Sequence, residues 1–110
     1  MVNEELEKIK LIHQAISKIL QFIEGIESVE ELTDNLMVWD AVKMNLIVIY
    51  ETDLKISTET KQKYSTVEWD KIQKHAPDVM NIYLGFDSKE IWKLIWEEIP
   101  DFKRKIEEIL

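Results

Sequence analysis

Apolar residues recur every three or four positions along most of the chain, the spacing that places side chains on one face of an α-helix. The first such segment runs from about Asn3 to Glu24. Asn3 suits an N-cap, and Gly25 stands where a glycine commonly ends a helix. The sequence therefore predicts an amphipathic first helix with an apolar stripe of Leu6, Ile9, Ile12, Ile16, Ile19, Leu20 and Ile23.

Two further helices are predicted before residue 55. Ser28 and Glu31 have the spacing of a capping box, which predicts a short helix or turn over Ser28–Leu32. A long helix is expected from about Thr33 to Leu54. Residues 47–50 alone have strand propensity, but the flanking period and the length of the segment favour helix. Residues 45–50 are apolar almost all round, so this helix is expected to be buried on more than one side.

The second half of the chain repeats the helical pattern with more interruptions. Ser57–Thr66 is polar and is expected to be half-helical, and Trp69, Ile72 and Val79 then resume the spacing. Pro77 predicts a helix start or kink, and Gly85 a stop. Ser88 is expected to cap the last helical pattern, and Pro100 either breaks that helix or starts a new one. The apolar positions of this pattern are Ile91, Trp92, Leu94, Ile95, Ile99, Phe102, Ile106, Ile109 and Leu110.

These segments predict one all-α domain over residues 1–110, a four- to five-helix up-and-down bundle. The chain has only two glycines and two prolines, far fewer turn residues than strand-rich folds use. It has no cysteine, so disulfides and thiolate metal sites are excluded. No apolar stretch resembles a signal peptide or a membrane span, so we expect a cytoplasmic protein without membrane partners.

The net charge of −8 disfavours non-specific binding of nucleic acid, which requires basic residues to replace phosphate counterions. A local basic patch can still act inside an acidic protein. RNA therefore remains a conceivable ligand that the overall charge opposes.

Isolated candidates for chemistry are few. His13 borders the first apolar stripe and suits a structural role, and His75 would need a partner base or metal. Glu-x-x-His, the spacing of di-iron bundles, is absent. A solvated acidic face accounts for the acidic residues around the second helix, so neither a metal nor a cofactor is expected. Those residues are Glu30, Glu31, Asp34 and Asp40.

Trp92 and Trp96 lie four residues apart, on one side of the last predicted helical pattern. Tryptophan is enriched at the centres of protein interfaces. The two side chains are therefore expected either in the core or at a subunit interface, and a cofactor site is the weaker alternative.

An ordered set of short motifs runs through the chain from about Ile9 to Ile106. The set consists of Phe-Ile-x-Gly at 22–25, Ser-x-Glu-Glu-Leu at 28–32, Asp-Ala-Val-x-x-Asn-Leu-x-x-Ile-x-Glu at 40–51, Leu-x-x-Ser-x-Glu-Thr-Lys at 54–61, Trp69, Tyr83, Asp87, Ile91-Trp92 and Ile99-Pro100. With these motifs the chain resembles the HepT-like proteins of the HEPN superfamily.

The resemblance implies a helical bundle that forms homodimers and pairs with a minimal nucleotidyltransferase in a toxin–antitoxin system. The toxin of such a pair is a metal-independent ribonuclease with the motif Arg-x4-His-x-Tyr, often with Asn directly after the Arg. A histidine can move protons during attack by the 2′-hydroxyl, and an arginine can stabilise the charge that develops on phosphorus. The partner enzyme can silence the toxin by attaching AMP to the motif tyrosine.

This chain departs from that motif. With Trp69 and Asp87 as anchors, the Arg position falls on Ala76, the adjacent Asn position on Pro77 and the His position on Asn81; only Tyr83 matches. Tyr50 also replaces the glycine that usually precedes Glu51. Alanine cannot hold a phosphate, and asparagine does not exchange protons near neutral pH.

Three functions follow as hypotheses. The first is a catalytically degenerate binding component beside a nucleotidyltransferase, with Tyr83 as the AMP-modification site. The second is an active ribonuclease toxin that uses other residues, such as Lys74, His75 and Tyr83. The third is a substrate-binding subunit for a nucleotidyltransferase. Pro77 and Asn81 favour natural divergence of the motif over deliberate inactivation.

Overall fold

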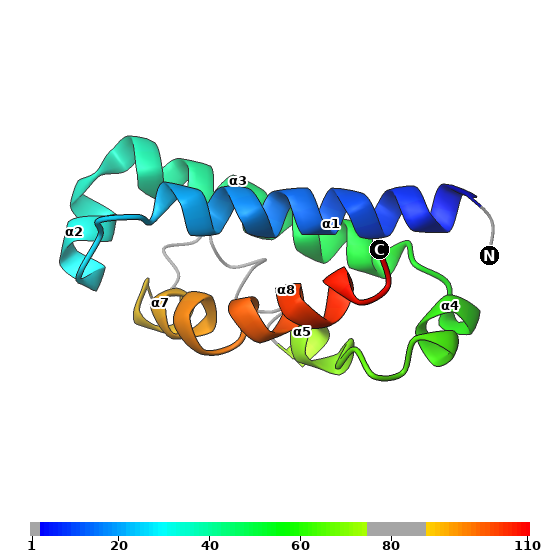
Figure 1. The fold of residues 1–110 in the computed structure, drawn as a ribbon. Helices are drawn as coiled ribbons and strands as arrows, with labels where there is room; N and C mark the ends of the chain where they lie inside the picture. Colours follow the sequence, from blue (N-terminus) through cyan, green and yellow to red (C-terminus); the bar gives the residue numbers. More distant parts are fainter. Residues whose placement is uncertain (1–2, 75–87) are drawn as a thin grey trace.

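The computed structural model describes residues 3–74 and 88–110, which form seven helices and no strand (Figure 1). The helices are α1 (Asn3–Phe22), α2 (Val29–Asp34), α3 (Leu36–Leu54), α4 (Thr58–Lys63), α5 (Asp70–Lys74), α7 (Ser88–Glu97) and α8 (Ile99–Glu107). Four of them, α1, α3, α7 and α8, are longer than two turns. The prediction of an all-α bundle is confirmed.

Helix α1 ends at Phe22, two residues before the predicted end at Glu24, and Gly25 lies in the turn that follows. Gly25 has a φ of +81°, a conformation that costs little only for a residue without Cβ, and it turns the chain toward α2. The predicted apolar stripe is inside: Ile9, Ile12, Ile16 and Ile19 are fully buried. The 3.6-residue period therefore predicted both the helix and the side that faces the core.

A side-chain cap begins α2 and another begins α3, so the prediction of one long helix from Thr33 is wrong in its start. The Ser28 Oγ accepts a hydrogen bond from the Glu31 N–H at 3.1 Å, and the Glu31 carboxylate accepts one from the Glu27 N–H at 2.8 Å. Six residues later the chain breaks again, and the Asn35 Oδ1 accepts from the Val38 N–H at 3.2 Å. Thr33 consequently belongs to α2, and α3 begins at Leu36.

Residues 47–50 are helical, as the flanking pattern predicted. Ile49 is buried, and Ile47, Val48 and Tyr50 are half-buried against the core, so α3 is covered over a wide part of its surface. At the far end of α3, α4 is a short helix capped by Ser57, whose Oγ accepts from the Thr60 N–H at 3.1 Å.

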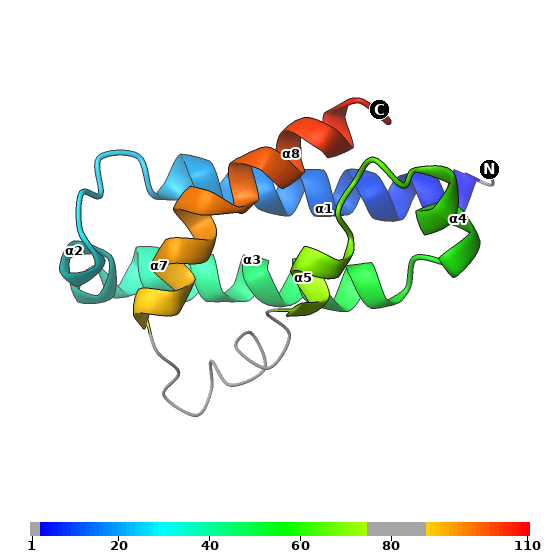
Figure 2. The same ribbon diagram turned by 90° about the horizontal axis from the view of Figure 1, so that it is seen from below.

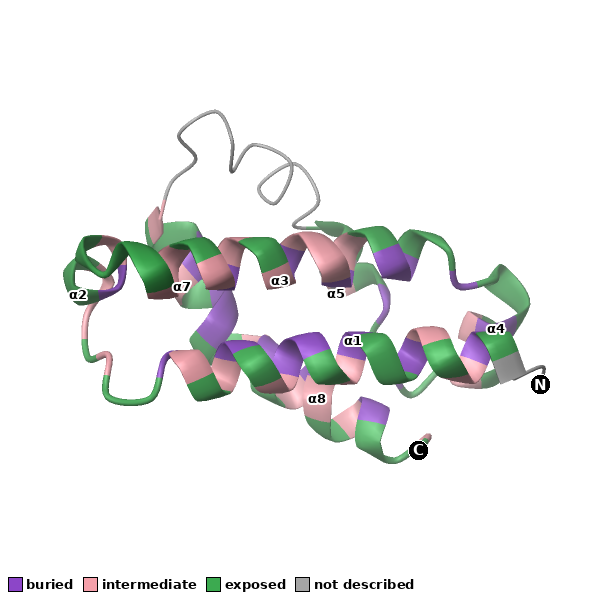
Figure 3. Ribbon diagram, turned by 90° about the horizontal axis from the view of Figure 1, so that it is seen from above, coloured by how far each residue is buried: buried purple, intermediate pink, exposed green. Residues whose placement is uncertain are grey.

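Pro100 divides the last helical pattern into α7 and α8, because it lies in the first turn of α8, where a missing N–H costs nothing. Helices α1 and α3 lie side by side and antiparallel, and α5, α7 and α8 lie on one side of that pair (Figures 1 and 2). Buried positions recur at helical spacing along α1 and α3 (Figure 3). Eleven of the nineteen buried apolar residues in the described ranges are isoleucines.

Candidate functional site

The motif positions that carry the proposed chemistry lie outside the described residues. Ala76, Pro77, Asn81 and Tyr83 all fall between residues 75 and 87, and so does His75. The flanks of this segment, α5 and α7, are described. Side-chain clusters are therefore described for residues 3–74 and 88–110.

Trp69, the upstream anchor of the motif, is fixed in the core just before α5. Its side chain is buried, and its Nε1–H donates to the Tyr64 carbonyl oxygen at 3.1 Å. Its ring meets Phe102 of α8 edge to face, with 5.9 Å between ring centroids. The chain that leads into residue 75 is thus held against α8 by a large aromatic contact.

A buried ion pair lies beside Trp69. Asp53 of α3 is inaccessible to solvent, and its Oδ2 is 3.2 Å from the Lys61 Nζ, which lies 5.9 Å from the Trp69 ring centroid. Burial raises the pKa of the Asp53 carboxyl, and the Lys61 charge opposes that rise. The other carboxylate oxygen, Oδ1, has no hydrogen-bond partner within the described part of the chain. This pair was not predicted, since no local pattern marks it.

Lys61 also lines a hollow of about 490 Å³ between α4 and α5. Lys71, Ser65 and Gln62 contribute polar groups to it, while Trp69 and Val67 form its apolar part. Two lysines with hydroxyl and amide groups could hold a small anion. However, the ammonium groups already pair with Asp53 and Glu68, so an anion would have to compete with a carboxylate for each of them.

A second polar cluster ties the start of α1 to α4. The Glu5 Oε1 accepts from the Ser57 N–H and from the Thr60 Oγ1, each at 3.0 Å, and its Oε2 is 3.2 Å from the Lys8 Nζ. The hydrogen bonds from Ser57, and then those from Thr60 and Lys8, outweigh burial and lower the pKa of Glu5 to about 2. Glu5 is therefore a charged structural anchor rather than a proton-transfer group.

The other predicted candidates have surface roles. His13 Nε2 lies 2.9 Å from a carboxylate oxygen of Glu107, an ion pair or hydrogen bond between α1 and α8, as expected of a structural histidine. The rings of Trp92 and Trp96 meet edge to face, with 5.5 Å between their centroids. Trp92 is half-buried, whereas Trp96 is 49% exposed. The tryptophan pair thus lies at the border between core and surface.

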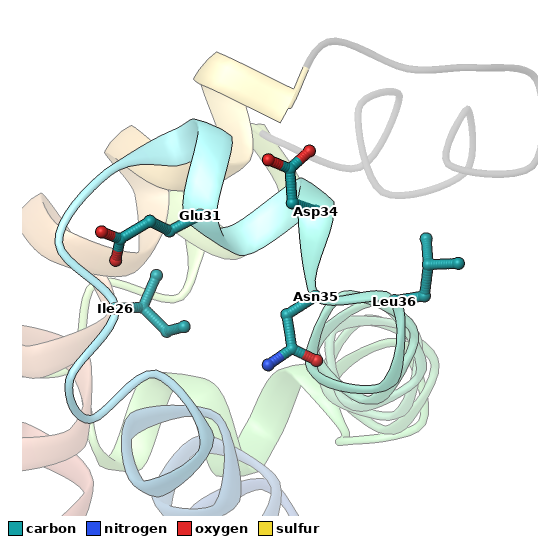
Figure 4. Close-up of a pocket in the computed structure, with 5 residues that line it drawn as sticks. All are labelled: Ile26, Glu31, Asp34, Asn35 and Leu36. Carbon is teal, nitrogen blue, oxygen red and sulfur yellow. The ribbon is translucent and has the colours of Figure 1, made fainter.

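The corner between α2 and α3 carries an open hollow of about 680 Å³, lined by Ile26, Glu31, Asp34, Asn35 and Leu36 (Figure 4). Ile26 and Asn35 lie across the hollow from each other, whereas Leu36 points away from both. Glu31 and Asp34 are exposed, as expected of a solvated acidic face, and both also line this hollow. Within the described ranges, no three His, Cys, Asp or Glu residues are grouped so as to hold a metal.

Comparisons with known proteins agree with the fold. The family model described as "Ribonuclease HepT-like" matches residues 12–109. A protein of Caldanaerobacter subterraneus named "Putative RNase TTE0752" is 27% identical over 99 residues, which cover 90% of this chain and 88% of that protein. "Probable ribonuclease HepT" of Thermococcus cleftensis is 27% identical over 95 residues, 78% of this chain and 86% of its own length.

No solved structure matches the chain. Among the described helices, none is both long and apolar enough to cross a membrane. The family match covers nearly the whole bundle, including α3, the Trp69 anchor and both C-terminal helices. The chain therefore belongs to the ribonuclease HepT-like family.

Proposed function

We propose that this protein is a catalytically degenerate HepT-like component that binds a nucleotidyltransferase-type partner instead of cleaving RNA. The observation that carries the proposal is chemical. The positions that need a guanidinium and an imidazole hold Ala76 and Asn81, which supply neither a fixed positive charge nor a proton-transfer group. The family scaffold around these positions is retained, from the Trp69 anchor to α8.

Cleavage of total tRNA by the purified protein tests this proposal. We expect no cleavage by the natural sequence and recovered cleavage by the double variant Ala76→Arg with Asn81→His, because the variant restores the motif spacing. A matched control, Lys63→Arg with Gln62→His, adds the same residue types on α4 and should remain inactive. Cleavage by the natural protein that disappears with His75→Ala would contradict the proposal.

That contradicting result would favour an active ribonuclease, the second candidate. The family description supports it, since it names a ribonuclease, and Lys74 is exposed at the end of α5 directly before His75. In this alternative His75 transfers the proton while Lys74 and Tyr83 contact the scissile phosphate. His75→Ala would then abolish cleavage without altering the circular dichroism spectrum.

Partnership with a minimal nucleotidyltransferase is tested by co-expression. We expect the two proteins to co-purify and Tyr83 to gain the mass of one AMP, a gain that Tyr83→Phe abolishes. Tyr64→Phe, at the residue that directly follows α4, is the matched control and should leave the modification unchanged. Co-purification without modification would instead favour a substrate-binding subunit.

A homodimer is the quaternary state that we propose for this component. Trp96 supports it, because a half-exposed tryptophan beside Trp92 is typical of an interface anchor. Sedimentation equilibrium should show a dimer that Trp96→Ser weakens at least about tenfold, equivalent to 1.4 kcal/mol. The exposed Leu110→Ser serves as the control. A monomer at all concentrations would contradict the dimer.

A further inference from the structure

The α2–α3 corner, defined as Ile26, Glu31, Asp34, Asn35, Leu36 and Met37, exposes large apolar side chains beside its hollow. Leu36 is 68% exposed and Met37 is 83% exposed, and they are adjacent in the first turn of α3. Single exposed apolar residues are ordinary on a protein surface, whereas neighbouring ones beside a hollow are typical of an interaction surface. Ile26 adds a half-buried side chain from the α1–α2 connection.

Hydrogen bonds of two helix caps hold the backbone of the corner. The Ser28 and Asn35 caps fix the start of α2 and of α3, and the Glu31 carboxylate closes the first of them through the Glu27 N–H. Surfaces held in their binding geometry lose less conformational entropy on association. The hollow is thus a formed surface whose shape rests on two helix caps.

Charge decides what the corner can bind. No Lys or Arg occurs between Ile19 and Val42, and the six acidic residues in that stretch are all exposed. They are Glu24, Glu27, Glu30, Glu31, Asp34 and Asp40. The nearest cation along the chain is Lys43, whose Nζ lies 3.4 Å from the Asp40 Oδ1. Lys103 of α8 lines a hollow together with Glu24, at the other end of the stretch. The corner therefore combines an apolar centre with a surrounding negative potential.

This combination excludes two occupants. A nucleic-acid backbone would bring phosphates against the exposed carboxylates of the corner. A second copy related by a two-fold axis would place the same acidic surface against itself, which costs several kcal/mol for like charges in contact. We propose that the α2–α3 corner docks a cationic amphipathic helix of another protein, with its apolar side on Leu36 and Met37. The proposal is independent of whether this chain cleaves RNA.

The test uses a fluorescein-labelled amphipathic peptide of leucine and lysine, about 18 residues or five helical turns long. Fluorescence anisotropy measures its affinity for the whole protein. Leu36→Ser with Met37→Ser should weaken binding about tenfold or more. The control, Leu11→Ser with Leu54→Ser, removes two other exposed leucines and should change the affinity less than about twofold.

A second pair of variants separates local from general electrostatics. Glu30→Gln with Asp34→Asn removes two charges at the corner, and Glu4→Gln with Glu7→Gln removes two at the opposite end of α1 (Figure 1). We expect the corner pair to lower the affinity and the salt dependence more than the distal pair. Equal losses would mean that the peptide follows only the net charge, and the proposal would fail.

Two further outcomes would also overturn it. If Leu36→Ser with Met37→Ser converted a dimer to a monomer in sedimentation, the corner would be a contact between copies. If a labelled single-stranded RNA lost affinity through the same double variant, the occupant would be nucleic acid. Circular dichroism of each variant confirms folding, which these exposed positions should not disturb.

Discussion

Glu5 shows how one carboxylate can join two parts of the chain that are 52 residues apart. It accepts from Ser57, Thr60 and Lys8, and these donors hold its pKa near 2 in the folded protein. In the unfolded chain the pKa returns to its ordinary value of about 4.5. The folded state is therefore stabilised above pH 4.5, and this stabilisation disappears as the pH falls toward 2.

We expect Glu5→Gln to lower the free energy of unfolding by about 2 kcal/mol at pH 7 and to flatten its decline between pH 5 and 2. Urea unfolding at a series of pH values measures both effects. Glu7→Gln is the control, since Glu7 is exposed and its ion pair with Lys10 is exposed as well; its effect should stay within about 0.5 kcal/mol. Parallel pH profiles for Glu5→Gln and the natural protein would contradict this account.

Asp53 changes the pH dependence of stability in the opposite direction to Glu5, because burial raises the pKa of its carboxyl group. The Asp53 carboxyl group takes up a proton more readily in the folded protein than in the unfolded chain. The free-energy cost of burying its charged form therefore grows as the pH rises. Lys61→Met should remove about 2 kcal/mol at pH 7, because the buried carboxylate loses its cation and is left with the hydrogen bond from Gln73, and less at pH 5. Adding Asp53→Asn should recover most of that loss. A loss that is equal at both pH values would show that Lys61 acts only by packing on Trp69.

At the scale of the helices, the Asn35 cap decides where α3 begins. Asn35→Ala should cost about 1 kcal/mol and lower the melting temperature by roughly 4 °C, because the Val38 N–H loses its acceptor. Asn35→Asp keeps an acceptor at this position and should remain within about 0.3 kcal/mol of the natural protein. Thermal unfolding followed by circular dichroism measures both variants. Equal melting temperatures for the Asn35→Ala and Asn35→Asp variants would mean that the cap contributes nothing to stability.

The helices also show why sequence reasoning succeeded in some places and failed in others. Helices α1 and α8 have a single apolar stripe, and the structure buries that stripe. The start of α3 was placed too early because Leu32, Leu36 and Met37 continue the helical spacing across the break at Asn35. Only the side-chain bond of Asn35 reveals the break, and asparagine is also common inside predicted helices.

The candidate site was predictable only where it depends on consecutive residues. The proposed motif substitutions at Ala76 and Asn81 rest on sequence order alone and lie outside the described residues. The Glu5 network and the Asp53–Lys61 pair depend on contacts between distant helices, for which the local pattern carries no signal. The acidic residues around α2 are exposed, as the sequence predicts, but the hollow beside them was not predicted. The exposure of Leu36 and Met37 appears only once α3 is placed.

For the whole molecule, stability should concentrate where α1 packs on α3. The buried residues of these two long helices form the centre of the core, whereas α4 and α5 are single short helices near the surface. Amide hydrogen exchange should therefore be slowest in residues 9–19 and 42–49 and faster in 58–63. Exchange as slow in α4 as in α1 would contradict this order and would assign α4 to the core unit.

The isoleucine-rich interior has a practical consequence for spectroscopy. Each isoleucine carries one δ1 methyl group, so selective labelling would place resonances in α1, α3, α7 and α8 at the centre of the bundle. Most of these methyl groups are buried and would report on the integrity of the core. Ile26 is different, since it lines the hollow at the α2–α3 corner. A chemical-shift change confined to the Ile26 methyl group would indicate docking at this corner. Unchanged shifts of the other isoleucine methyl groups would show that the fold is unaltered.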